Sequence, residues 1–430
     1  MGKFRYFVSP AKEQVNFGYP YDPATMDAPF YSEIEISDFI LEDSFTSIDE
    51  SLDDPKHLGG IFSYANFQMD VDNFTGKFAI GASPLIFPYK IKGSKIRIEW
   101  DDAAKNPICG DARTICGDVY LIQSRKVFEG IIFDEPMQKD SDLQILQFQV
   151  LGYLSLLDEL GNFSFQTADK NSHSVIFQIF LPLVERGIKK EEANLPTLSN
   201  NLSDYVNFAR DNNQPNVIVV TPPIDNDKNL KDLLNDMISI AGGYIYFIDD
   251  TYYFRKIVFD PIRPNFQLEA FNQNAQEGIE NIMDLKIKPE FDRVFSKIVW
   301  TNEQPYGVTD PDWHEISAAD PNLFGIKPFE IDFFEYVTTI AEADKVMNYY
   351  AGEFSDLKKG FRITLPLSFD AMEPYFLESV KVIIPPKATK TFASSDINDG
   401  EIFPTIVFGR KIDMRKETIE FYLRWAANWP

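Results

Sequence analysis

Histidines and paired carboxylates are the side chains of this chain that could bind a metal ion or move protons. The three histidines, His57, His173 and His314, lie far apart, and none has a second His or Cys at metal-ligand spacing. His314 stands among carboxylates in the segment 310–315, Asp-Pro-Asp-Trp-His-Glu. A lone loop histidine of this kind is usually a surface residue. The sequence therefore predicts no metal site and no bound cofactor.

Three acidic pairs raise the question of calcium binding or glycoside hydrolysis: Asp70 with Asp72, Asp101 with Asp102, and Asp249 with Asp250. A calcium loop needs oxygen ligands at fixed offsets around an internal glycine, which no stretch supplies. A glycosidase needs two carboxylates about 5–10 Å apart across a cleft, and 66 Asp and Glu residues make pairs on turns common in any case. Nucleophile-elbow, phosphate-loop and dinucleotide motifs are also missing from the sequence. We therefore expect no catalytic residue and no enzyme activity.

The chain has two cysteines, Cys109 and Cys116, which is too few for a secreted disulfide framework. Their spacing is also wider than that of a zinc knuckle. A local bridge across this loop and two free thiols both remain open, and cytosolic assembly favours the free thiols.

Composition indicates a soluble, β-rich protein with several domains. The chain has 430 residues, of which 44% are hydrophobic and 14% aromatic, and aromatic residues favour strands. The formal net charge of −25 repels nucleic acid and anionic membranes. It is either an ordinary solvated surface or an acidic surface past which DNA slides. No signal-peptide h-region or membrane-span-length apolar stretch is present, so we expect synthesis in the cytosol and no membrane-spanning segment.

The clearest local structure lies in residues 227–257. Asp227 is a helix cap, and apolar residues then recur at three- and four-residue spacing as far as Ala241. Gly242-Gly243 ends the helix, and the strands 244–248 and 251–257 follow as a hairpin. A one-faced helix therefore runs directly into a hairpin that can cover it.

The rest of the chain is positioned around this segment in a predicted order of domains. These are an N-terminal arm at 1–32 that follows a short strand, a first antiparallel β-barrel-like domain at 33–160, a small α+β module at 161–275, and a second β-barrel-like domain at 276–430 with one helix at 339–357. We expect the Pro-, Asp- and Gly-rich residues 301–330 to form a loop. The arm either lies on a neighbouring subunit or packs on its own domain. The predicted fold class is mainly β with an α+β insertion.

The two β-rich parts share an order of strands. In the first, the strand 95–100 precedes a glycine-containing strand at 127–133 and a closing strand at 146–151. In the second, 380–385, 405–413 and 418–424 follow the same order. This likeness suggests two related barrels on either side of the mixed module.

Three segments together resemble the family of phage baseplate hub and tail-associated proteins. They are the strands within 128–157, the helix and hairpin at 230–254, and the closing strands at 408–424, Phe-Gly-Arg-Lys-Ile-Asp-Met-Arg-Lys-Glu-Thr-Ile-Glu-Phe-Tyr-Leu-Arg. The resemblance covers roughly residues 60–430 and consists of patterns of residue type, while 1–32 and 301–330 have no counterpart.

The resemblance implies a virion structural subunit of the viral tail, assembled in the host cytoplasm and located at the tail tip. The expected form is a homotrimer whose two barrels per chain make a pseudo-sixfold ring. Its expected partners are the tail tube or distal tail protein, the tape-measure protein, and tip or fibre proteins. DNA would pass the lumen during ejection without specific binding.

Two other interpretations remain open. The first is a surface or secreted β-rich carbohydrate-binding protein in which Trp313, Trp425 and Trp429 stack on sugars. A signal peptide is expected for such a protein and is not found. The second is a glycosidase on a β-scaffold, for which the sequence offers no defined pair of carboxylates.

Overall fold

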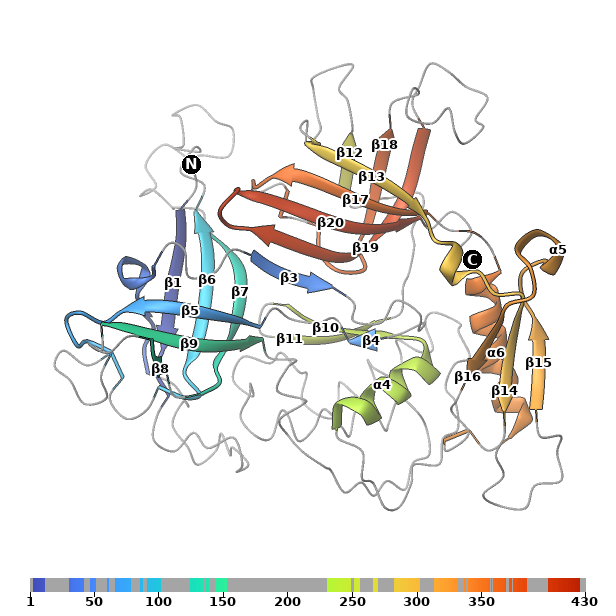
Figure 1. The fold of residues 1–430 in the computed structure, drawn as a ribbon, viewed down its shortest axis with the longest axis horizontal. Coiled ribbons are helices and arrows are strands. Elements are labelled where there is room, and N and C mark those ends of the chain that lie inside the picture. Colours follow the sequence, from blue (N-terminus) through green and yellow to red (C-terminus); the bar gives the residue numbers. More distant parts are fainter. Residues whose placement is uncertain are drawn as a thin grey trace, which may run out of the picture.

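The computed structural model describes residues 3–11, 31–41, 47–51, 60–61, 66–78, 86–87, 91–101, 124–134, 136–139, 144–152, 230–248, 251–255, 266–269, 282–301, 313–331, 336–337, 339–355, 357, 359–368, 371–372, 374–384 and 401–425. These residues form two seven-stranded sheets and two three-stranded sheets (Figure 1). Within this part of the chain, none of the helices has the length and apolar character needed to cross a membrane.

The first sheet is antiparallel and curled, with the strand order β2-β1-β6-β7-β9-β5 and β8 beside β9. Buried Ile, Val, Phe and Trp side chains fill its inner side. Its strands are β1 (Lys3–Ser9), β2 (Ile34–Glu35), β5 (Phe67–Asp72), β6 (Lys95–Asp101), β7 (Ser124–Ile132), β8 (Met137–Gln138) and β9 (Ile145–Gly152). Because β1 lies between β2 and β6, the first residues of the chain are an integral part of the sheet.

One short segment, residues 34–41, touches both edges of this sheet. At one edge β2 pairs with β1, and the amide of Ile36 donates to the Tyr6 carbonyl at 2.8 Å. The 3₁₀ turn Ser37–Phe39 then leads from β2 to the other edge, where Ile40 forms an antiparallel bridge with Val71 of β5. At the other edge the amide of Leu41 donates to the Asp70 carbonyl on β5 at 3.1 Å. The segment thus closes the curled sheet into a barrel-like form, which leaves less edge open to unwanted pairing.

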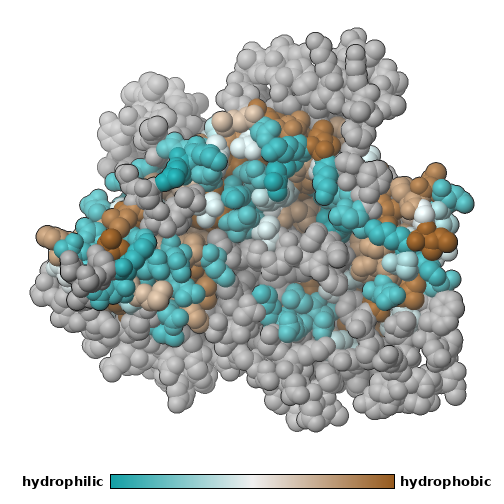
Figure 2. Space-filling view, in the orientation of Figure 1, coloured by the Kyte–Doolittle hydropathy of each residue, from teal (hydrophilic) through white to brown (hydrophobic). Residues whose placement is uncertain are grey.

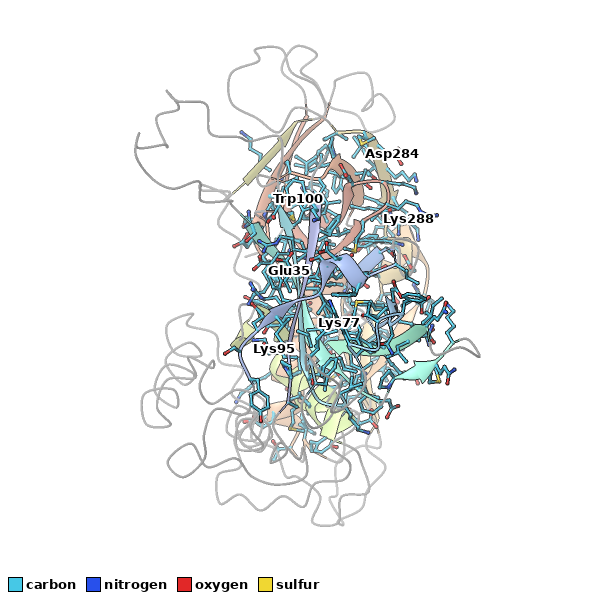
Figure 3. All side chains as sticks on the ribbon, turned by 90° about the vertical axis from the view of Figure 1, so that its left-hand side faces the viewer. Glu35, Lys77, Lys95, Trp100, Asp284 and Lys288 are labelled. Atoms are coloured by element: carbon cyan, nitrogen blue, oxygen red, sulfur yellow. The ribbon has the colours of Figure 1, made fainter. Side chains whose placement is uncertain are left out.

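The second sheet has the order β12-β18-β19-β20-β17-β13, with β3 beside β19. Its strands are β3 (Ser47–Ser51), β12 (Phe266–Glu269), β13 (Asp284–Pro289), β17 (Lys359–Pro366), β18 (Ser379–Ile384), β19 (Glu401–Asp413) and β20 (Thr418–Trp425). The charged residues Asp284 and Lys288 of the edge strand β13 point away from the sheet (Figure 3). Charges on an edge strand discourage pairing with other chains.

Three strands of the described chain cross between regions that are distant in sequence. β3 pairs with β19, β12 pairs in parallel with β18, and β4 (Gly60–Ile61) pairs in parallel with β10 (Tyr244–Ile248). Residues 47–51, within the range expected for the first barrel, therefore belong to the second sheet. The parts of the molecule are interleaved and are not strung together as separate units.

The two large sheets share a four-strand core. In each, three successive long strands are neighbours and the strand that precedes them lies beside the last of the three, giving β6-β7-β9-β5 and β18-β19-β20-β17. The two-residue strand β8 falls between β7 and β9 in the chain and pairs with β9 outside this order. The middle strand of each carries a β-bulge, at Val127 in β7 and at Phe408 in β19. The prediction of a mainly β chain with barrel-like sheets and few helices is thereby confirmed.

The helices pack against the two small sheets. Helix α4 (Leu230–Ala241) precedes the hairpin of β10 and β11 (Thr251–Arg255), and Gly242 ends the helix with a φ of +71°. Helix α6 (Ile340–Phe354) begins at the cap Thr339 and packs on the sheet of β14 (Lys297–Thr301), β15 (Trp313–Ser317) and β16 (Pro328–Ile331). Both predicted helices and the hairpin are confirmed. The hairpin loop 249–250 and most of the α+β module predicted at 161–275 lie outside the described residues.

The prediction of a loop over 301–330 was wrong. This range contains β15, the short helix α5 (Pro321–Phe324) and most of β16. Proline and aspartate here start elements and do not break them. Asp320 caps α5, whose first residue is Pro321, a position where proline is favoured. Pro328 begins β16, an edge strand, where its missing N–H costs little.

We expect Gly130→Ala to destabilise the fold strongly. A β-carbon at Gly130 in β7 would overlap the Leu151 carbonyl oxygen and would lie 2.7 Å from Cζ of Phe128. Such overpacking costs about 1–3 kcal/mol. Chemical denaturation followed by circular dichroism measures the loss.

The matched control is Gly352→Ala in α6, where a new β-carbon meets nothing within 4 Å. Alanine there should stabilise the protein by up to about 1 kcal/mol. Equal effects of the two substitutions would contradict the close approach of β7 and β9.

Candidate functional site

Several residues that the sequence analysis singled out lie outside the described part of the chain. They are His57, His173, Asp102, Cys109, Cys116, Asp249, Asp250 and Trp429. His314 lies in β15, in register with Trp300 of β14, and Trp313 is its neighbour in the strand. Trp425 is half-buried at the end of β20 and packs edge-on against Phe403, with ring centroids 5.9 Å apart. That packing does not favour Trp425 as an open platform for sugars.

The remaining acidic candidates have structural partners. Asp70 is buried on β5, where it pairs with Lys139 and accepts from Gln147 at 3.0 Å. Asp72 accepts from the amide of Phe74 at 2.8 Å in the turn after β5. Asp101 lies 3.8 Å from Arg5, and burial raises the pKa of Asp101 against the opposing effect of that arginine. Among the described residues, no group of three or more His, Cys, Asp and Glu side chains is arranged to hold a metal ion.

The most unusual chemistry of the described residues is a layer of aromatic rings and buried charges where β10 meets the second sheet. Tyr244 of β10 packs edge-on against Phe408 of β19, with centroids 5.8 Å apart. Tyr246 packs in the same way against Phe376 at 6.1 Å. Both tyrosines are almost completely buried, and burial raises the pKa of Tyr244 to about 12. We call this layer the junction.

Two buried arginines share one carboxylate at the edge of the junction. Nε of Arg424 lies 3.1 Å and Nε of Arg293 lies 3.9 Å from Oε2 of Glu290. The shorter contact is an ion pair whose N–H is not aligned for a hydrogen bond. The guanidinium of Arg424 also lies 4.2 Å from the ring centre of Phe408. Burial, and then the charge of Arg424, lowers the pKa of Arg293 to about 10.

A second buried ion pair fixes β3 to β19. Nε of Arg410 lies 2.5 Å from Oε2 of Glu50, and both side chains are at least nine-tenths buried. The guanidinium of Arg410 also lies 4.1 Å from the ring centre of Tyr375. Burial raises the pKa of Glu50, while the charge of Arg410 opposes that change. The pair therefore joins strands 360 residues apart in the chain.

Tyrosines of α6 join the two helices beside the junction. The hydroxyl of Tyr350 donates to the Ser239 carbonyl, and that of Tyr349 donates to the Gly242 carbonyl, each at 3.3 Å. Tyr336, just before α6, donates to Asp236 at 2.9 Å. The end of α4 is therefore anchored to α6.

This arrangement holds parts of the chain in a fixed relation. The carboxylates and guanidinium groups of the junction are engaged with one another and with aromatic faces, which suits rigidity. Sequence reasoning missed these residues. Period-two alternation could have shown that Glu50 and Arg410 are buried. Glu50 lies two residues after Ile48, and Arg410 lies two residues before Ile412, so each shares the buried face of its strand with an isoleucine.

Comparisons with known proteins bear on the fold. No protein-family model matches the chain, and no curated protein matches it either. Among solved structures, it is similar to a tail protein from Neisseria meningitidis MC58, with a TM-score of 0.52, 12% identity, and coverage of 92% of this chain and 95% of that one.

Two further structures are similar with lower scores. The 43 kDa tail protein of prophage MuSo2 from Shewanella oneidensis has a TM-score of 0.47 and 12% identity, covering 97% of this chain and 98% of its own. The prophage tail protein gp18 from Listeria monocytogenes EGD-e has a TM-score of 0.46 and 9% identity, covering 99% and 95%. The likeness to the Neisseria protein shows a shared fold, which confirms at that level the resemblance inferred from the sequence.

We expect removal of one partner of the buried pair to be costly. Glu50→Met leaves the Arg410 charge buried without its carboxylate, and such a change costs about 3–5 kcal/mol. The double variant Glu50→Met with Arg410→Met should be more stable than Glu50→Met alone, since no charge is left buried. Urea denaturation of the single and double variants measures the difference.

A matched control is Lys286→Ala, which removes an exposed pair with Asp284. It should change the free energy of unfolding by no more than about 0.5 kcal/mol. A double variant that is no more stable than Glu50→Met alone would contradict a coupled buried pair.

Acid should weaken the ion pair that joins β1 to β2. Arg5 binds both carboxylate oxygens of Glu35 (labelled in Figure 3), at 3.0 and 2.6 Å, and this lowers the pKa of Glu35 to about 2. A folded pKa below the unfolded value of about 4.3 adds stability above that unfolded value, and this stability is lost as the pH falls through 2. The pair is partly exposed, so its effect is modest.

The measurement compares the thermal unfolding of the wild type and Glu35→Gln from pH 7 to pH 2. The wild type should have the higher melting temperature at pH 7. The difference in melting temperature between the two proteins should narrow steadily below pH 5. If the difference in melting temperature stays constant down to pH 2, the Arg5–Glu35 ion pair is not the cause of that difference.

Proposed function

We propose that this chain is a structural subunit of a phage tail-tip or baseplate hub, located in the virion tail. The observation that carries the proposal is the fold shared with the Neisseria tail protein, which extends over 92% of this chain and 95% of that one. Shape, and not chemistry, is then what the chain contributes.

The repeated topology suits a ring that joins different symmetries. Each chain carries two curled sheets with the same four-strand core and a bulge in the same strand. Three copies would present six similar sheets, which could meet a sixfold tube on one side and a threefold tip on the other. The junction supports this role because it holds β10 in a fixed position against the second sheet.

The net charge of −25 supports passage of DNA through such a ring. Carboxylates repel the phosphate backbone, whereas DNA-binding proteins attract it with Lys and Arg. A homotrimer would place this excess of acidic residues around one lumen. DNA would then pass during ejection without adhering.

The expected partners follow from a place at the end of the tube. They are the tail tube or distal tail protein, the tape-measure protein, and tip or fibre proteins. The acidic candidates Asp70, Asp72 and Asp101 have structural roles, so the proposed function assigns no reaction to this chain.

We expect the purified chain, alone or with tail-tube protein, to form particles of three times 49.3 kDa. Mass photometry gives the mass of the particles. Class averages from negative-stain electron microscopy should show rings with threefold symmetry and a central hole. Antibody against the chain should label the tail tip of intact virions. A chain absent from the tails of virions would overturn the proposal.

A further inference from the structure

One stretch of the chain closes the first large sheet and also completes the second. Its first part, residues 33–41, joins the two edges of the curled first sheet. Its second part is β3, residues 47–51, which pairs with β19 and is drawn in blue beside that red strand in Figure 1. Five residues, 42–46, separate the two parts in the sequence. We call the two parts together the strap.

Two glutamates in the first part of the strap are each bound by an arginine through both carboxylate oxygens. Nε of Arg97, on β6, lies 2.9 Å from Oε1 of Glu33, and its Nη2 contacts Oε2. Arg5, on β1, binds Glu35 in the same two-pronged way, which is the strong geometry for such a pair. Both guanidinium groups also contact the Phe7 ring, at 4.8 Å and 4.6 Å from its centre. Because β1 lies between β2 and β6, the Arg97–Glu33 pair reaches across β1.

The four side chains of these two pairs are between 23% and 38% exposed. Figure 2 shows hydrophilic residues, in teal, over parts of both large sheets on the face in view. Arg5 also lies 3.8 Å from Asp101, and Arg97 contacts Glu99, so the pairs belong to a larger charged surface. Salt in the solvent screens partly exposed charges of this kind. The hold of β1 and β6 on the strap should therefore depend on ionic strength.

Apolar burial adds less to the first part of the strap than to the strands around it. Within residues 33–41, all of which the structure describes, Ile36 alone is fully buried. The backbone of this part is attached through the β2–β1 pairing, the Ile36 amide and, at the other edge, the amide of Leu41. A segment with little buried apolar surface and few backbone bonds opens locally while the rest of the protein stays folded.

The second part of the strap is bound by its own arginine. The buried side chains of β3 are Ile48 and Glu50, and Glu50 pairs with Arg410 of β19. The five residues between the two parts span at most roughly 20 Å when extended. When one part is docked, the other is therefore held close to its own site, which raises its effective concentration there. Docking of each part favours docking of the other.

We propose that the strap couples the two large sheets of a chain, because its two parts dock and release together. Closure of the first sheet and completion of the second then depend on each other. The Arg97–Glu33 and Arg5–Glu35 pairs set how firmly the strap is held, so salt shifts the equilibrium of the whole strap. The inference concerns the conformation of a single chain and goes beyond its proposed place in a tail.

The test is hydrogen–deuterium exchange of the full chain, read by mass spectrometry on peptides covering 34–41, 47–51 and 409–413. The double variant Glu33→Gln with Glu35→Gln removes both charges from the first part of the strap. Exchange in 34–41 should become about fivefold faster than in the wild type, and exchange in 47–51 and 409–413 should rise with it. Raising the salt concentration from about 0.05 M to about 0.5 M should speed the exchange of the wild type more than that of the double variant.

The reverse experiment starts from the second part of the strap. Ile48→Ala removes buried apolar volume from β3. Exchange in 34–41 should then rise as well, because coupling between two sites is reciprocal. The matched control is Glu315→Gln, which removes the partly exposed pair with Lys297 between β15 and β14 and should leave the strap peptides unchanged. Circular dichroism verifies that every variant is folded.

The proposal is overturned if the double variant speeds exchange in 34–41 but leaves 47–51 and 409–413 unchanged, or if 34–41 does not respond. An equal rise in all peptides, those of β14, β15 and β16 included, would indicate global destabilisation and would overturn it too. The measurement uses the isolated chain, whereas the proposed function is judged by labelling of virion tails. Failure of one therefore leaves the other standing.

Discussion

Charge buried within the second sheet, beside the junction, is the constraint on which the rest of this structure depends. A guanidinium group removed from water is tolerated only with a carboxylate or an aromatic face close at hand. Arg410 has Glu50 and Tyr375, and Arg424 has Glu290 and Phe408. The two ion pairs join residues far apart in the chain, Glu50 with Arg410 and Glu290 with Arg424. A small shift of β3 against β19, or of Glu290 against β20, would separate these charges from their partners, so the place of β3 in the second sheet is well defined.

The interleaving of strands serves the same end. β3 leaves the first region to complete β19, β4 leaves it to pair with β10, and β12 reaches from the mixed region to β18. Strand pairing through backbone hydrogen bonds therefore links the first region to the second sheet, the first region to the mixed region, and the mixed region to the second sheet. The proposed role is that of a structural subunit in a ring. For such a subunit, rigid coupling between its regions matters more than any single reactive group.

Much of the fold followed from local patterns, and what did not follow depended on distant partners. The helix α4 and its hairpin were predictable because their apolar spacing, cap and glycine stop lie within one short stretch. The shared core of the two sheets was visible in strand order and in Gly130 and Gly409. By contrast, Pro321 and Pro328 suggested a loop, since proline breaks some elements and begins others. The partnership of Glu50 with Arg410 could not be found, because period-two alternation shows which face is buried but not which strand lies opposite.

The pairing of β3 with β19 also governs how the chain is made. Glu50 leaves the ribosome 360 residues before its partner Arg410. At about 5–20 residues per second, the strand waits roughly 20–70 s for its place in the sheet. During that interval the Glu50 carboxylate stays hydrated, and water binds the backbone N–H and C=O groups of β3. Residues 409–413 of β19, which pair with β3, have not yet been synthesised. The second sheet is therefore completed only near the end of synthesis, and a truncated nascent chain would leave one of its earliest strands without a template.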